Sequence, residues 1–284
     1  MSRSDERRRG QGRARRRGAV NRFIAAGLGL CGLALPAMAA DMGVPNIAPA
    51  PVPVVPWTGL YAGINFGWAA SNNALGNTPT DTGGAGLGAM VAARAIPESM
   101  RGIHGGFIGG TQIGFNWQFC PTWVAGIETD FDWLANSDAK SVFSYGGSLA
   151  FPVLNTTFVR GLDTLGTVRA RFGWLMTPLF LAYATGGLAY GETRMGTTFN
   201  CPSCTPQAAV SSTSSGISTG WTVGAGLEWQ FAPQWSVKGE YLWVDLGSRS
   251  ETISYPYGAF NSTLTSSVHE RDGIVRTGLT YRFW

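Results

Sequence analysis

The end of the chain, Asp272–Trp284, alternates between a largely apolar and a more polar face. In the stretch DGIVRTGLTYRFW, Val275, Leu279 and Phe283 share one side of an extended strand, and Arg276 and Arg282 share the other. An apolar face that ends in aromatic residues, backed by a face that carries two arginines, is typical of a strand with lipid outside and a polar lumen inside. This stretch therefore predicts a transmembrane β-barrel.

Similar alternation recurs on both sides of three prolines, Pro121, Pro178 and Pro233. Each proline lies in the pattern Trp-x-x-x-Pro-x-aromatic. Because proline fixes φ and has no N–H donor, it marks a tight turn rather than a strand interior. Long segments rich in Gly, Ser, Thr and Asn separate these turns. Short turns at one end and long loops at the other are the asymmetry of an outer-membrane barrel, whose short turns face the periplasm.

We therefore expect an all-β fold, an eight-stranded antiparallel transmembrane up-and-down β-barrel with both termini in the periplasm. The segment 179–192 does not alternate cleanly, so its faces cannot be assigned. The expected strands are 57–69, 104–119, 122–134, 162–176, 179–192, 220–231, 234–246 and 272–284, and the expected long loops are 70–103, 135–161, 193–219 and 247–271.

Tryptophan positions give an independent indication of the membrane boundaries. An indole prefers the interface between lipid and water, where its ring is apolar and its N–H stays hydrated. A strand of about ten residues covers roughly the 25 Å apolar band of such a barrel. All eleven tryptophans fall in the expected strands or at their ends, and four strands carry one near each end: 57 and 68, 123 and 133, 221 and 229, and 235 and 243. We expect two aromatic girdles, whereas a soluble barrel would place its apolar face inward.

Ahead of the barrel domain, 57–284, the sequence predicts two further segments. Residues 1–39 form an expected signal peptide, with an Arg-rich start, the apolar run Phe23–Leu35 and a small-residue cleavage site. That run is too short to serve as a membrane anchor. Residues 40–56 are Pro-rich and are expected to be an extended periplasmic linker.

The net charge of +4 misrepresents the exported protein. Residues 1–40 hold nine of the 21 basic residues and two of the 17 acidic ones, which leaves 12 basic and 15 acidic residues after them. The basic cluster lies in a segment expected to be removed, so nucleic acid is not an expected partner.

Charged residues on the inward faces are expected to form a lumen charge network. An eight-stranded interior is just wide enough to be filled by its own side chains, and buried charges require partners. The alternative is a narrow path for ions or solutes whose selectivity these charges set. The residues are Glu128, Asp130, Asp132, Arg169, Arg171, Glu228, Lys238, Glu240, Arg276 and Arg282.

The remaining reactive residues give weak indications of chemistry. Cys201 and Cys204 are a possible disulfide, because exported proteins mature in an oxidising compartment, and Cys120 is expected to be free. One CxxC without further ligands is weak evidence for zinc, so we expect no metal and no cofactor. Near His104 and His269 no set of nucleophile, base and orienting group can be traced, so no catalytic residues are predicted.

Three stretches resemble the outer-membrane immunogenic protein family, which consists of small OmpA-like barrels often described as the porin family. They are WTGLYAGINFGW at 57–68, WSVKGEYLWVDLG at 235–247 and TYRF at 280–283. The resemblance covers about 57–284 and implies an outer-membrane barrel of a Gram-negative bacterium, with surface-exposed antigenic loops and no catalytic residues. The C-terminal strand resembles the signal read by the barrel-insertion machinery, although Trp284 follows Phe283.

The expected function is therefore a structural and surface-interaction role with four long extracellular loops on display. Expected partners are outer-membrane lipid and lipopolysaccharide, the barrel-insertion machinery, and host or surface ligands that bind the loops. Two alternatives remain open: a narrow porin-like channel for small hydrophilic solutes, and a lipid-modifying barrel enzyme with a Ser–His pair.

Overall fold

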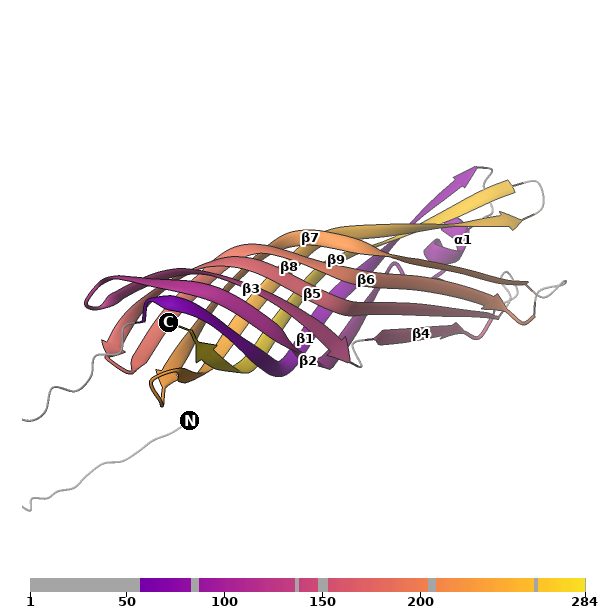
Figure 1. Ribbon diagram of the computed structural model, residues 1–284. Helices are drawn as coiled ribbons and strands as arrows, with labels where there is room; N and C mark the ends of the chain where they lie inside the picture. Colours follow the sequence, from indigo (N-terminus) through magenta and orange to yellow (C-terminus); the bar gives the residue numbers. More distant parts are fainter. Residues whose placement is uncertain are drawn as a thin grey trace, which may run out of the picture. The chain divides into compact units, whose positions relative to one another are not determined.

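The computed structural model describes residues 57–82, 87–135, 138–147, 153–203, 208–257 and 260–283. The expected signal peptide 1–39, the expected linker 40–56 and Trp284 lie outside these residues. No helix in the described part is long and apolar enough to cross a membrane. The elements are β1 Gly59–Thr82, α1 Leu87–Ala92, β2 Ser99–Cys120, β3 Trp123–Ala135, β4 Ala139–Tyr145, β5 Leu154–Thr177, β6 Phe180–Cys201, β7 Ala208–Gln230, β8 Trp235–Tyr257 and β9 Phe260–Arg282 (Figure 1).

Antiparallel pairing closes the strands into a barrel. Their order is β3-β2-β1-β9-β8-β7-β6-β5-β4, and an additional pairing of β3 with β5 joins the ends. Both β3 and β4 pair with β5: β3 along residues 164–174, and β4 along residues 154–160. Eight strands therefore complete the ring, and β4 continues the position of β3 along the barrel. This confirms the all-β, antiparallel up-and-down barrel expected from the sequence, whereas the expected eight strands become nine in the described residues because β4 is a separate strand.

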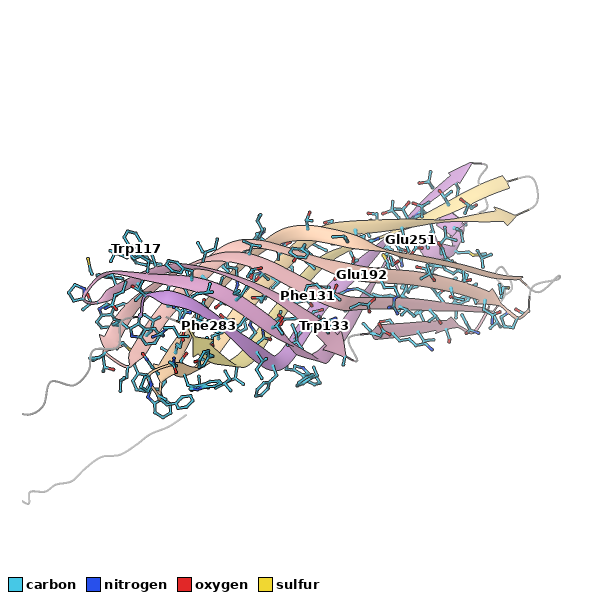
Figure 2. The ribbon with its side chains drawn as sticks, in the orientation of Figure 1. Trp117, Phe131, Trp133, Glu192, Glu251 and Phe283 are labelled. Atoms are coloured by element: carbon cyan, nitrogen blue, oxygen red, sulfur yellow. The ribbon has the colours of Figure 1, made fainter. Side chains whose placement is uncertain are left out.

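Near the short turns, apolar side chains point outward and charged side chains point inward. Ile127 is 56% exposed on β3, whereas its neighbour Glu128 is 2% exposed. The C-terminal strand behaves in the same way, with Val275 exposed and Arg276 buried. Figure 2 shows the exposed Trp117 near one end of the barrel and the exposed Trp133 farther along it. A surface of this kind excludes water and suits contact with hydrocarbon.

Trp57 was expected in an aromatic girdle on the outer face, and this prediction was wrong. Its side chain is buried, and its Nε1–H donates to the carbonyl oxygen of Pro178 at 3.0 Å. The guanidinium of Arg282 lies over its ring, 4.6 Å from the ring centroid. The residue precedes β1 and enters the lumen instead of lying on the lipid-facing surface. The other tryptophans of the described residues are exposed on the outer face, as expected: 68, 117, 123, 133, 174, 221, 229, 235 and 243.

The structure assigns the faces of β6, which the sequence left open. Leu181 and Tyr183 are buried in the lumen, whereas Phe180, Leu188 and Tyr190 are exposed. The faces of this strand could not be assigned from the alternation of its residues, because Leu181 is apolar although its side chain points into the lumen.

The four predicted long loops were wrong over most of their length. The strands on both sides continue into 70–103, 193–219 and 247–271, and 135–161 contains β4 and the start of β5. The first of these segments also contains α1. Figure 1 shows these extensions at the end of the barrel that carries α1 and β4. Their Ser- and Thr-rich composition is shared by loops and by water-facing strands, so composition alone could not distinguish the two.

The polarity of the wall is reversed at several positions in these extensions. Leu75, Phe158 and Met195 point inward and are buried, whereas the cross-strand pair Thr252 and Thr265 is exposed. A wall with an apolar inside and a polar outside is the arrangement of a barrel in water. The alternation expected of a membrane strand is therefore inverted here, and the inversion marks the end of the lipid-facing band.

Candidate functional site: the charged lumen

Arg169 on β5 lies at the centre of the lumen and contacts three carboxylates. Its Nη2 lies 2.5 Å from Glu128 Oε1 and 2.8 Å from Asp130 Oδ2, and its Nη1 lies 3.2 Å from Glu240 Oε2. Glu128 is the direct cross-strand partner of Arg169, so the register of β3 and β5 brings these two charges together.

Arg276 on β9 binds a second set of carboxylates around the same centre. Its Nη1 lies 2.7 Å from Asp132, its Nη2 lies 2.7 Å from Asp130, and its Nε lies 2.6 Å from Glu240. Because Asp130 and Glu240 also contact Arg169, the two guanidinium groups share their acceptors. Each planar guanidinium offers several N–H donors, which suits this bridging role.

Lysine and tyrosine side chains complete the ionic layer. Lys238 Nζ lies 2.8 Å from Glu128 Oε2, and Arg171 pairs with Glu228. The hydroxyl of Tyr61 donates to Glu128 at 2.7 Å. Tyr183, whose inward orientation could not be assigned from the sequence, has its hydroxyl 3.2 Å from Glu240 Oε2.

The structure brings nine of the ten predicted lumen residues into one connected network. The tenth, Arg282, lies nearer the short turns, over the ring of Trp57. Together, the ten residues carry five negative and five positive formal charges. They are Glu128, Asp130, Asp132, Glu228 and Glu240, with Arg169, Arg171, Lys238, Arg276 and Arg282.

Apolar layers lie along the lumen on both sides of the ionic network. Toward the short turns, Trp57, Val124 and Leu181 pack together. In the other direction, Ile108, Leu165 and Ile274 belong to another buried cluster, so the lumen alternates between apolar and ionic filling. These layers were not predicted from the sequence, because inward residues of a membrane strand are expected to be polar. Side chains that fill the interior in this way leave it packed rather than open.

A separate polar cluster lies beyond the girdle, inside the strand extensions. Arg160 Nη2 is 2.7 Å from Glu270 Oε2, and it donates to the hydroxyl of Ser71. Burial raises the pKa of Glu270 to about 7, although the charge of Arg160 opposes the shift. The folded state therefore keeps a proton that the unfolded chain releases between pH 4.5 and about 7, and this group's contribution to stability falls as pH rises through that window.

The outer face carries a hydrogen-bonded set that the sequence did not reveal. His269 Nδ1 lies 2.9 Å from Ser248 Oγ, and its Nε2 lies 2.9 Å from Asp245 Oδ1. A register shift at Asp245 and Gly247 brings the carboxylate under the imidazole. Similar hydroxyl pairs continue farther along the same two strands, so sheet register accounts for the Ser–His contact. The set supplies a nucleophile, a base and an orienting group, but Asp245 also binds Arg271 at 3.0 Å.

The cysteines are only partly within the described residues. Cys201 is buried and disulfide-bonded, and its expected partner Cys204 lies outside the described residues. Cys120 is free and exposed at the end of β2, as expected.

The chain is similar to known outer-membrane proteins. A family model described as "Outer membrane protein beta-barrel domain" matches residues 25–283. The chain is 36% identical over 250 residues to the 31 kDa outer-membrane immunogenic protein of Brucella melitensis biotype 1, covering 87% of this chain and 93% of that protein. The protein of the same name from Brucella suis biovar 1 gives the same values.

Among solved structures, the outer membrane protein OprG from Pseudomonas aeruginosa is similar with a TM-score of 0.40 and 14% sequence identity. The match covers 80% of this chain and 97% of that chain. A similarity at this level supports no inference about function.

Proposed function

Because the chain belongs to the outer membrane protein beta-barrel domain family, we propose that it acts as a structural and surface-interaction protein of the Gram-negative outer membrane. The single observation that carries this proposal is the filled lumen. Ion pairs centred on Arg169 and Arg276 and apolar layers beside them occupy the space through which a solute would pass. The barrel then serves as an anchor, and its activity lies in the surface that it presents.

We further propose that the short turns and both termini face the periplasm. The outward apolar faces extend as far as these turns, where Trp117, Trp174 and Trp229 are exposed. The strand extensions at the other end carry polar outward faces, such as the pairs of Ser250 with Ser267 and Thr252 with Thr265. Polar faces of this kind favour water over hydrocarbon, so the extensions project from the cell surface.

In this orientation, the surface exposed outside the cell consists of the strand extensions and the turns that join them. It does not consist of four long loops. Host or surface ligands would bind these extensions and the turns that join them. Outer-membrane lipid and lipopolysaccharide would surround the aromatic band. The alternating strand β9, which ends at Arg282 and is followed by Phe283, would be the segment read by the insertion machinery.

Conductance in planar lipid bilayers tests the filled lumen. We expect the inserted protein to give no stable stepwise openings, because an ion would have to displace buried ion pairs and cross apolar layers. Insertion into the same lipid is verified by the heat-dependent shift in gel mobility that folded barrels show. Stable openings whose ion selectivity changes in Lys238→Gln would contradict the proposal and establish the channel alternative.

A further inference from the structure

A groove lies on the outer face of the barrel, beside the girdle tryptophans Trp68 of β1 and Trp243 of β8. Its volume is about 850 Å³. Small residues create the depression: Ala70 and Gly273 face each other across β1 and β9, and both line the groove. The ring of Tyr241 lies over Gly273, where a Cβ atom would come within 2.8 Å of the tyrosine hydroxyl. Aromatic side chains therefore surround a surface of small residues. They make the half of the groove nearer the short turns apolar.

The sheet is interrupted behind this groove. The ladder between β1 and β9 runs continuously from Tyr61 to Ala70 and resumes only at Leu75, which pairs with Val268. Along the intervening stretch, the inward residues Ser71 and Asn73 also line the external groove. The interruption therefore brings these two polar side chains to the wall of the groove.

Two arginines lie in the other half of the groove, which is nearer the strand extensions. Arg101 on β2, opposite Ala74, and Arg271 on β9, opposite Asp245, both line it, together with His269. Among the described residues that line the groove there is no carboxylate. Arg271 is half exposed, and its Nε is held by Asp245 at 3.0 Å, which orients the guanidinium. Planar guanidinium groups bind phosphate and carboxylate oxygens through paired hydrogen bonds.

We propose that this groove binds the anionic headgroup of an outer-leaflet glycolipid, with an acyl chain packed along Trp68 and Val275 below it. The two halves of the groove match an amphiphile, since the apolar half lies at the girdle and the cationic half lies beyond it. A soluble anion would use only the arginines and gain nothing from the aromatic walls. The inference rests on the proposed function, because it requires this end of the barrel to lie in the outer leaflet.

Lipid retention on the full-length protein in nanodiscs tests the inference. The probe is bisphosphorylated lipid A, compared with the same lipid after removal of its phosphates, and native mass spectrometry counts the lipid bound. We expect the wild-type protein to prefer the phosphorylated lipid. The double variant Arg101→Gln/Arg271→Gln is expected to bind it roughly tenfold or more weakly, because charge-assisted hydrogen bonds are lost.

The matched control is Arg194→Gln. Arg194 is an exposed arginine on β6 that also lies in a strand extension and also pairs with an aspartate, Asp163, at 2.5 Å. We expect this control to bind like the wild type. A second variant, Ala70→Phe, fills the floor without changing the charge and is expected to weaken binding as well.

The outcomes separate this inference from the proposed function. Equal binding by the double variant and the wild type, or no preference for the phosphorylated lipid, would overturn the groove assignment while the barrel still inserts. Displacement of the lipid by inorganic phosphate at a comparable concentration would overturn the commitment to a lipid. Failure of the wild-type protein to insert into bilayers would instead contradict the proposed function itself.

Discussion

Replacing Arg169 with methionine is expected to lower the free energy of unfolding by about 3–5 kcal/mol, the range found when one partner of a buried ion pair is removed. Methionine fills a similar volume, so the loss comes from charge rather than from a cavity. Glu128, Asp130 and Glu240 would each lose a contact in the lumen. Denaturant unfolding of the protein in lipid vesicles, followed by tryptophan fluorescence, measures the change.

Arg194→Met is the control for this prediction. The side chain of Arg194 is 44% exposed, and that of its partner Asp163 is 29% exposed, so water compensates both charges when the pair is broken. We expect a loss of less than about 1 kcal/mol, as for other surface ion pairs. Equal losses in the two variants would mean that the lumen network does not hold the barrel together.

Replacing Ile127 with arginine is expected to destabilise the barrel by about 2–4 kcal/mol, the cost of a cation at the bilayer midplane of a barrel. Ile127 is 56% exposed on β3, near the middle of the segment between Trp123 and Trp133. The guanidinium would have to leave water for hydrocarbon, because it points away from the lumen carboxylates. The same vesicle unfolding assay measures the loss.

Val142→Arg provides the matched control, since Val142 is 58% exposed on β4, in the extension beyond the girdle. We expect little change there, because the new charge stays in water. A large loss at both positions would show that the variants act through strand packing. No loss at either position would show that Ile127 does not face lipid.

The sequence predicted the membrane-spanning half of the fold well, and the reason is physical. Where lipid lies outside and ion pairs lie inside, the two faces of a strand differ most, as they do for Ile127 and Glu128. Alternation then fixes both the face and the partners, so the charged residues of the lumen could be named in advance. The family resemblance is confirmed by 36% identity over most of the chain to the Brucella protein.

The other half of the barrel could not be predicted in the same way. In the extensions, apolar and polar side chains both fill the interior and hydroxyl groups lie outside, so Met195 and Thr252 reverse the expected pattern. Trp57 was placed at the interface because tryptophan prefers it, whereas its side chain is buried and its N–H is satisfied by the carbonyl oxygen of Pro178 in the turn between β5 and β6. The groove beside Trp68 depends on an interrupted strand pairing, which leaves no trace in composition or periodicity.

Contact between methyl groups and lipid, measured by nuclear Overhauser effects in nanodiscs, tests the central claim most directly. The claim is that one set of aliphatic side chains lies in hydrocarbon and another lies inside the sealed barrel. We predict cross-peaks to acyl-chain protons from Val223, Leu227 and Val275, which are 47%, 55% and 62% exposed, and none from the buried Leu165, Leu242 and Ile274. Cross-peaks from the second set, with none from the first, would contradict the account.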